Sequence, residues 1–297
     1  MGVETHMREF DIAFLGHYTK DTIVSPHETK TVNGGAFNYG ARVAVKMGLR
    51  AAVITRLAEE DFEVVDDLTR IGVEVFATPT PQSTNLKLVY PTENLDHRTV
   101  YNVGSAGPFT PAEVAPVQAR VFHIGASIRG EVPLEVFKAL AQKETRISLD
   151  VQGFLRVNRG GVLVHEDWPE IAQVLELVDV LKADAVEAEA LTGRSDLRKA
   201  ARALAELGPD EVILTHRKGV LVYADRRFHA APFHTREMKG RTGRGDTCTA
   251  AYLGKRLTAS PAEAILWAAA LTSLKMEAQG PFSREIGEVA GLIRERY

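Results

Sequence analysis

The sequence has a single cysteine among its 297 residues, Cys248. One cysteine cannot form a disulfide within the chain, and it cannot supply the several thiolates of a metal cluster. The nine histidines are scattered without the spacing of metal ligands, and we expect His165 and His216 to be surface or structural residues. A metal centre built from cysteine or histidine is therefore not expected, and the cysteine usage fits a reducing, cytoplasmic location.

An excess of positive charge is also missing. The chain has 36 lysines and arginines against 39 acids, a formal net charge of −3 at pH 7, which gives no basis for binding nucleic acid or an anionic membrane surface. No apolar run approaches the roughly twenty residues that span a membrane. Residues 1–10 are charged and lack the apolar core of a signal peptide, so we expect the first few residues to be a leader outside the fold.

The chain does contain a regular alternation of short apolar runs and helical segments. We expect strands at residues 10–15, 51–55, 73–76, 121–124, 146–150, 178–182 and 211–215, and an antiparallel pair at 220–223 and 227–231. We expect helices at residues 36–47, 62–71, 133–142, 169–177, 186–191, 197–207, 246–257, 261–276 and 285–296. This alternation predicts a doubly wound α/β fold, with a mostly parallel central sheet and helices on both faces.

Two polar β segments interrupt this alternation, at residues 21–33 and 84–102. Each has the pattern of a hairpin, the first ending at the glycines 34–35 and the second turning through 93–96. Because such polar strands do not suit the buried sheet, we expect them to pair with each other as a small β-lid. The chain shows no linker or internal repeat, so we predict one domain over residues 9–297 with both hairpins inserted in it.

The stretch from residue 240 to 255 places three glycines before a helix, at Gly240, Gly243 and Gly245. Glycine turns and helix starts present unpaired backbone N–H groups, which favour an anion such as phosphate. Asp246 follows at once, and a carboxylate there suits a base that takes a proton from a hydroxyl attacking the phosphate. From these residues alone an N-cap role for Asp246 is equally consistent. The glycine spacing fits neither the dinucleotide-binding pattern nor the Walker pattern.

Residues 33–38 form a second polar group. Paired glycines before a helix let a ligand approach the backbone, and the Asn38 amide can donate to and accept from a hydroxyl. A plain turn followed by a helix is the simpler interpretation. Asp21, Asp150 and Gln152 lie close after predicted strands, where they are either acceptors for substrate hydroxyls or turn residues.

A third group lies at the predicted helix start after the strand at 178–182. Asp184 and Glu187 are three residues apart there, so their carboxylates face the same way and could hold a hydrated Mg²⁺. An N-cap with a capping-box glutamate explains the same pair more simply.

Together these segments resemble the PfkB (ribokinase-like) carbohydrate kinase family over nearly the whole chain. Residues 33–48 resemble its N-terminal signature, and residues 242–247, Thr-Gly-Arg-Gly-Asp-Thr, resemble its C-terminal signature, D-T-x-G-A-G-D. Members have a doubly wound α/β domain with a β-lid and transfer the γ-phosphate of ATP, with Mg²⁺, to a hydroxyl of a sugar, nucleoside or related polyol. The resemblance therefore implies an ATP-dependent kinase that acts on a small sugar or polyol.

The resemblance also assigns roles to individual residues. It makes Asp246 the catalytic base and the backbone amides of Gly243, Arg244 and Gly245 the anion hole. The residues implied to bind substrate hydroxyls are Asp21, Gly34, Gly35, Asn38, Asp150 and Gln152. Those implied for the nucleotide site are Asp184, Thr215, Lys218, Gly219 and Gly280. Glu187 is implied to organise Mg²⁺ through water.

Some positions depart from the family pattern. Arg244 replaces an alanine in the anion hole, and Asp184 replaces an asparagine. The turn at 215–219 is one residue shorter than the usual T-x-G-x-x-G and lacks its first glycine. Gly240 stands where many members have an aspartate that helps to hold a monovalent cation, so the resemblance does not imply K⁺ activation here.

The substrate class rests on shorter segments. Residues 16–18 with Asp21, together with residues 150–152, are similar to plant myo-inositol kinases, which favours an inositol-like substrate. A nucleoside kinase and a non-catalytic ligand sensor of the same fold are the alternatives. The sequence is compatible with a monomer or a homodimer.

Overall fold

The computed structural model describes residues 9–92 and 98–297. The expected leader and the expected turn at 93–96 lie outside the described residues. Among the described residues, no helix combines the length and the apolar composition that a membrane crossing needs.

The larger of two sheets has nine strands in the order β15-β14-β13-β12-β9-β8-β1-β4-β5. In sequence order these are β1 (Glu9–Leu15), β4 (Ala51–Leu57), β5 (Glu74–Pro79), β8 (Gln118–Ile124), β9 (Arg146–Asp150), β12 (Val180–Asp184), β13 (Glu211–His216), β14 (Gly219–Ala224) and β15 (Arg227–Pro232). The pairings from β5 to β13 are parallel, and β14 and β15 add an antiparallel edge. The predicted mostly parallel sheet is confirmed.

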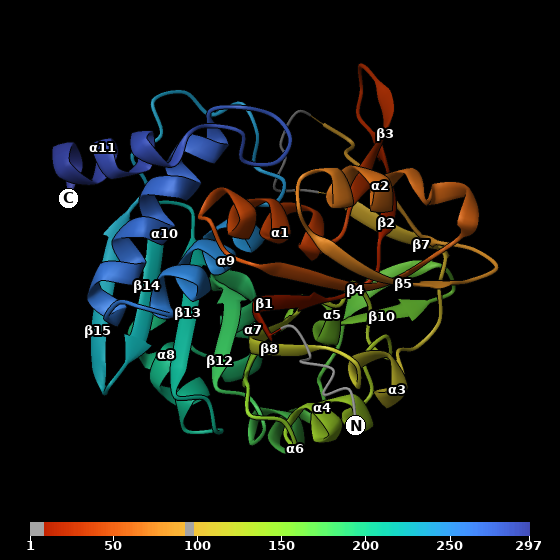
Figure 1. The fold of residues 1–297 in the computed structure, drawn as a ribbon, viewed down its shortest axis with the longest axis horizontal. Coiled ribbons are helices and arrows are strands. Elements are labelled where there is room, and N and C mark those ends of the chain that lie inside the picture. The colour runs from red at the N-terminus through yellow and green to blue at the C-terminus, as the bar shows by residue number, and fades with distance from the viewer. Residues whose placement is uncertain (1–8, 93–97) are drawn as a thin grey trace, which may run out of the picture.

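Helices cover both faces of this sheet, and each face has its own hydrophobic core (Figure 1). Side chains alternate along β1, where Ile12 and Phe14 point into one core and Ala13 and Leu15 into the other. The first core packs against α1 (Ala36–Lys46), α2 (Glu63–Arg70), α9 (Arg244–Arg256), α10 (Pro261–Met276) and α11 (Ile286–Arg296). The second packs against α3 (Pro111–Val114), α4 (Leu134–Leu140), α6 (Ile171–Leu175), α7 (Ala185–Thr192) and α8 (Leu197–Ala205). The fold is therefore doubly wound, as predicted.

The smaller sheet has six strands in the order β10-β11-β7-β6-β2-β3. The two predicted hairpins supply β2 (Thr19–Val24), β3 (Thr29–Gly34), β6 (Thr84–Val89) and β7 (Thr99–Gly104). They pair with each other through the parallel contact of β2 with β6, as expected of the lid. Leu86, Leu88, Tyr90 and Ile128 form the small core of this sheet.

Two lid strands were not predicted, β10 (Arg156–Arg159) and β11 (Val162–His165). They form a hairpin over the two glycines 160–161, both with positive φ, and β11 joins β7. Each strand has four residues and β10 carries two arginines, so neither shows the apolar alternation by which a strand is recognised. A paired glycine turn between valines was the available signal.

The predicted helix at 169–177 is reduced to the five residues of α6, and the helix predicted at 246–257 begins two residues earlier, at Arg244. The remaining short pieces are a 3₁₀ turn, η1 (Glu59–Asp61), and α5 (Gln152–Leu155). The carboxyl ends of β1, β9, β12 and β13 meet at one edge of the large sheet, since these strands run parallel. The predicted site residues lie along this edge and on the facing lid.

Candidate active site

The glycine loop leads into helix α9, whose N-cap residue is Gly243, in the left-handed region with a φ of 74°. A side chain is excluded at Gly243, because a Cβ there would lie 2.1 Å from the Tyr39 ring. Asp246 is thus the third residue of the first helical turn, and the N-cap alternative for it is wrong. In that turn its carboxylate still lies at the positive end of the helix.

The surroundings of Asp246 suit a base. Burial, followed by the charge of Asp150, raises the pKa of Asp246 to about 7, while the charges of Lys182 and Lys275 oppose that rise. A carboxyl group with a pKa near neutrality is partly ionised at neutral pH, and its carboxylate form has a usable affinity for a proton. The arrangement is chemically competent for the predicted base role.

Lys182 connects Asp246 to the other acids of the site. Its side chain is buried in β12, and its Nζ lies 2.8 Å from Asp150 Oδ2 and 3.8 Å from Glu187 Oε2. Burial disfavours the ammonium, but the two carboxylates outweigh burial and raise the pKa of Lys182 above its ordinary value. The same Nζ would lie 3.0 Å from a Cβ at Gly245, so this ammonium lies against the first turn of α9.

The helix α7 begins with a capping box. The Asp184 side chain accepts hydrogen bonds from the amides of Val186 and Glu187, and Glu187 Oε2 accepts one from the Asp184 amide at 2.6 Å. The interpretation of Asp184 as an N-cap with Glu187 as its capping-box glutamate is therefore confirmed for the local geometry. Glu187 is also buried beside Lys182, and burial raises the pKa of its carboxyl despite that neighbour.

Asp184 and Glu187 could hold Mg²⁺ only as a hydrated ion. Among the described residues, no group of three or more His, Cys, Asp or Glu side chains is arranged to hold a metal. Mg²⁺ keeps several waters and commonly binds through one or two carboxylates plus substrate phosphates. Glu187 fits that mode, with water and donor oxygens as the other ligands.

On the lid, Asp21 of β2 lies directly over Gly34 of β3. A Cβ at Gly34 would lie 2.4 Å from Asp21 Oδ2 and 2.3 Å from Thr19 Oγ1, so only glycine leaves room for this carboxylate. Burial raises the pKa of Asp21 to about 6, against the hydrogen bond from Thr19 and the charges of Arg156 and Arg98. Asp21 Oδ1 has no hydrogen-bond partner among the described residues, which leaves it available to a hydroxyl.

The other residues predicted to bind substrate hydroxyls are engaged within the protein. Asn38 donates from Nδ2 to the Asn33 carbonyl at 2.9 Å, and its Oδ1 accepts from Arg42 at 3.3 Å, so this amide holds the turn from β3 into α1. Gly35 is the N-cap of α1 with a φ of 94°. Asp150 is the counter-ion of Lys182 and accepts from the Gln152 amide at 3.0 Å.

Comparison with known proteins identifies this arrangement. The model of the pfkB family carbohydrate kinases matches residues 5–284. The chain belongs to this family. A pyrophosphate-dependent kinase of the ribokinase family, solved with a pyrophosphate analogue and myo-inositol, is 35% identical to it, and the match covers 94% of this chain and 99% of that one with a TM-score of 0.87.

Two further relatives are more distant. The cytidine kinase of Thermococcus kodakarensis is 26% identical over 263 residues, which make up 85% of this chain and 91% of that protein. Arabidopsis thaliana ribokinase, solved with ribose and ATP, is 19% identical with a TM-score of 0.76 and covers 97% of this chain and 99% of its own. At that identity the likeness establishes the fold alone. The pfkB family assignment and the ribokinase-like fold predicted from the sequence are both confirmed.

Three of the predicted nucleotide residues, Thr215, Lys218 and Gly219, lie at the short turn between β13 and β14. Thr215 is buried in β13, whereas Lys218 is exposed in the turn. Gly219 is required by the neighbouring strand, because a Cβ there would lie 2.4 Å from the Ala231 carbonyl. Gly280 lies in an exposed turn with a φ of 77° and open space around it. The structure thus places Gly280 and Lys218 at the surface and Thr215 and Gly219 within the sheet.

Positive charge gathers beside this turn. Burial, followed by the charges of Arg244 and Lys218, lowers the pKa of His216. Both cations therefore lie close to His216, at the edge where α9 begins. Arg244, the residue that the family pattern did not explain, is the first residue of α9.

Sequence reasoning missed two cations of the site, Lys182 and Arg156. Lys182 was detectable as a lysine within an otherwise apolar strand. Arg156 belongs to the unpredicted strand β10, and burial and the nearby Arg98 lower the pKa of its guanidinium, while Glu187, Asp150 and Asp21 oppose that lowering. These three acids come from helix α7, from strand β9 of the large sheet and from lid strand β2, so Arg156 lies between the two sides of the site.

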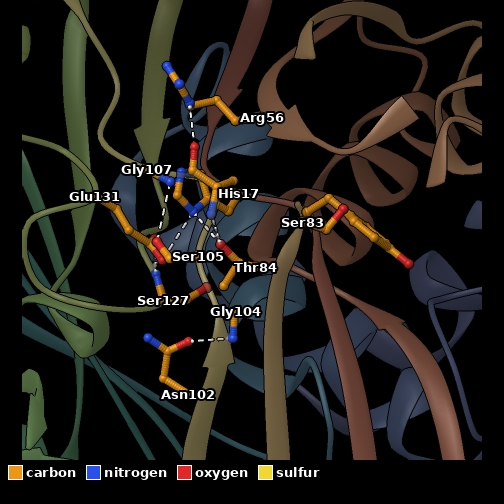
Figure 2. Close-up of polar contacts among 12 residues, drawn as sticks. His17, Arg56, Ser83, Thr84, Asn102, Gly104, Ser105, Gly107, Ser127 and Glu131 are labelled. Atoms are coloured by element: carbon orange, nitrogen blue, oxygen red, sulfur yellow. Dashed lines mark hydrogen bonds and ion pairs between the residues drawn. The ribbon is translucent and has the colours of Figure 1, made fainter. Parts of the chain in front are cut away.

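A buried polar cluster joins the lid to the large sheet. His17, which is fully buried between β1 and β2, has its Nδ1 2.8 Å from Thr84 Oγ1 and 3.2 Å from Glu131 Oε1 (Figure 2). Glu131 Oε2 in turn accepts from the Ser127 amide at 2.7 Å. Thr84 begins lid strand β6, so the cluster holds the crossing from the large sheet into the lid.

Proposed function

We propose that this kinase phosphorylates a hydroxyl of a myo-inositol-like cyclic polyol and that its preferred phosphoryl donor is inorganic pyrophosphate. The observation that carries the donor assignment is a set of cations around the site: Lys182 against the first turn of α9, Arg156 of the lid near Asp21, Asp150 and Glu187, and Arg244 and Lys218 near His216. Pyrophosphate is small and densely charged, and a site rich in arginine and lysine suits its oxygens. The kinase that is 35% identical uses pyrophosphate, which supports the same assignment here.

The reaction follows from the placement of these groups. Asp246 takes the proton of the acceptor hydroxyl, the freed oxygen attacks the donor phosphorus in line, and the bond to the leaving phosphate breaks. The amides of Gly243, Arg244 and Gly245 hold the donor oxygens, and Lys182 and Arg156 offset the charge that develops on them. Glu187 would hold a hydrated Mg²⁺, which would supply further neutralisation of the donor charge.

The acceptor lies against the lid in this proposal. Among the described residues, Asp21 Oδ1 is buried without a hydrogen-bond partner, so it can accept from a ring hydroxyl of the acceptor. Gly34 and Gly35 allow the polyol to approach the backbone, while Asn38, Asp150 and Gln152 support that surface through their internal contacts. The lid excludes water from the donor and so suppresses its hydrolysis.

Two alternatives have observations in their favour. ATP is the donor implied by the family resemblance, with Thr215, Lys218, Gly219, Gly280 and Asp184 around the nucleotide, and the exposed Gly280 turn leaves space there. A nucleoside acceptor is supported by the relative that is a cytidine kinase. A nucleoside base would need an aromatic ring to stack on. Tyr90 does not offer one, because it packs into the lid core and its hydroxyl accepts a hydrogen bond from Arg98 at 2.8 Å.

A donor-by-acceptor matrix tests the proposal. Pyrophosphate and ATP are each combined with myo-inositol, ribose, fructose, cytidine and adenosine in the presence of Mg²⁺, and ³¹P NMR identifies the phosphorylated product. We expect the highest kcat/KM for pyrophosphate with myo-inositol. A higher value with ATP overturns the donor assignment, and a higher value with a nucleoside overturns the acceptor assignment. Ligand binding without transfer to any acceptor supports the non-catalytic sensor instead.

A further inference from the structure

The carbonyl groups of the glycine loop converge on one side chain. Lys275, the last but one residue of α10, donates from Nζ to the Gly240 carbonyl at 3.1 Å and to the Thr242 carbonyl at a shorter distance. The adjoining backbone is tied to the same helix end, because the amides of Lys239 and Gly240 donate to the Met276 carbonyl at 2.8 and 3.1 Å. The loop that precedes Asp246 is therefore fastened to the C-terminal end of α10.

The ammonium is enclosed rather than solvated. Lys275 is 2% exposed, and its Nζ lies 5.6 Å from the centre of the Tyr39 ring. The same ring occupies the space of a side chain at Gly243. Lys275, Tyr39 and Gly243 thus pack as one unit behind the loop.

The direction of the carbonyls determines the direction of the amides. A peptide group carries its C=O and N–H on opposite sides, so a loop that aims its amides at an anion aims its carbonyls away from it. Carbonyl oxygens gathered at one buried point need a positive partner, since leaving them unsatisfied costs free energy. Lys275 is that partner for Gly240 and Thr242, the residues that lead into the proposed anion hole.

We propose that the Lys275 ammonium is a built-in cation that fixes the carbonyls of Gly240 and Thr242 and thereby orients the loop amides and Asp246 toward the donor phosphate. Lys275 acts here as a positioning residue, because it reaches the reaction through the loop. The reaction part of this inference rests on the phosphoryl transfer proposed above. With its own ammonium in place, the enzyme has no need of a monovalent metal ion at these carbonyls.

The test replaces the ammonium and then offers a substitute. We expect Lys275→Met to lower kcat/KM roughly 100-fold, as removal of a preorganised electrostatic contact does. Added KCl or NH₄Cl, in a Mg²⁺-containing buffer whose only other monovalent cation is tetramethylammonium, restores part of the loss, since a small cation fits between the vacated carbonyls. Wild type is unaffected by the same salts. The matched control is Lys255→Met on α9, whose Nζ lies over the Trp267 ring at 4.8 Å, away from the loop carbonyls.

Several outcomes overturn the inference. These are wild-type kinetics in Lys275→Met, a loss in a folded Lys275→Met that neither salt reverses, and stimulation of wild type by K⁺. Stimulation of wild type by K⁺ overturns the inference even if Lys275→Met does not fold, because that measurement does not need the variant.

Hydrogen exchange separates this inference from the proposed reaction. In Lys275→Met without substrate, we expect the amides of residues 240–246 to exchange faster than in wild type and to slow again with added K⁺. Unchanged exchange refutes the positioning role. If wild type transfers phosphate from no donor, the proposed function fails. The hydrogen-exchange result still tests whether Lys275 fixes the glycine loop.

Discussion

Asp246 lies among charges that act on it in opposite directions. Asp150 and burial disfavour its ionised form, while Lys182 and Lys275 favour it, and the result is a pKa of about 7. Such a group changes protonation state close to neutral pH, where an ordinary aspartate is fully ionised.

The first prediction concerns the pH dependence of the reaction. Because the base must be ionised, kcat/KM of wild type falls as the pH drops below about 7 and reaches a plateau above it. Asp246→Asn, which keeps the side-chain size, lowers turnover roughly 100- to 10,000-fold. The measurement is a pH–rate profile with the preferred donor and acceptor. Turnover of Asp246→Asn close to that of wild type removes Asp246 from the base role.

The second prediction concerns stability. The folded state raises the pKa of Asp246, so it favours the protonated form relative to the unfolded chain. The cost of the ionised carboxylate is absent below the unfolded value of 3.8, grows between 3.8 and about 7, and is complete above 7. We expect Asp246→Asn to have a higher Tm than wild type above pH 7 and a smaller advantage as the pH falls. A Tm below that of wild type across this range contradicts the assignment.

At the scale of the element, the β2–β3 hairpin shows how pairing creates a site. Its register sets Thr19 opposite Gly34, and this brings Asp21 over the glycine. The hairpin itself was predictable from two β-prone segments around a proline-containing turn. The carboxylate position was not, since it depends on which residues face each other across the strands.

The third prediction tests this hairpin. In Gly34→Ala the new methyl group lies where Asp21 Oδ2 and Thr19 Oγ1 are, so the carboxylate has to move. We expect a higher KM for the acceptor, with the KM for the donor little changed. The matched control is Gly287→Ala in α11, where an added Cβ meets nothing within 4 Å. Equal acceptor KM values in the two variants indicate that Asp21 does not bind the acceptor.

At the scale of the molecule, the two sheets meet through the cluster around His17. The His17 ring contacts Thr84 and Glu131 (Figure 2). Its centre also lies 4.9 Å from that of the Phe109 ring, with the two ring planes tilted by 41°. Thr84 and Glu131 lie far apart in the sequence, and the histidine that joins them lies at the start of the lid. The crossing from the large sheet into the lid is therefore anchored by buried side chains. The assignment of residues 9–297 to a single domain stays a prediction.

The fourth prediction concerns this anchor. His17→Leu removes the ring nitrogen that contacts Thr84 Oγ1 and Glu131 Oε1, and loss of the buried hydrogen bond with Thr84 costs roughly 1–3 kcal/mol of the free energy of unfolding. We expect His17→Leu to speed hydrogen exchange relative to wild type, and to do so more in the lid strands β2 and β6 than in β1 or β8. The matched control is His229→Leu in β15, an edge strand of the large sheet, which leaves hydrogen exchange in β2 and β6 unchanged. Equal effects of the two substitutions argue against the anchor.

The sequence by itself determined the order of strands and helices, the pairing of the lid hairpins and the family. These features depend on the local alternation of apolar residues and on two short glycine motifs. Both signals lie within short continuous segments of the chain. The hairpin of β10 and β11 was not predicted, because two four-residue strands, one mostly polar and one mostly apolar, are too short to show alternation.

Only the tertiary structure decided the chemistry of the site. It placed Asp246 within the first turn of α9, put Lys182 between two acids, brought Arg156 across from the lid and seated Lys275 behind the glycine loop. The physical reason is that charge and proton affinity depend on burial and on neighbours through space. Those neighbours come from segments that the sequence keeps far apart.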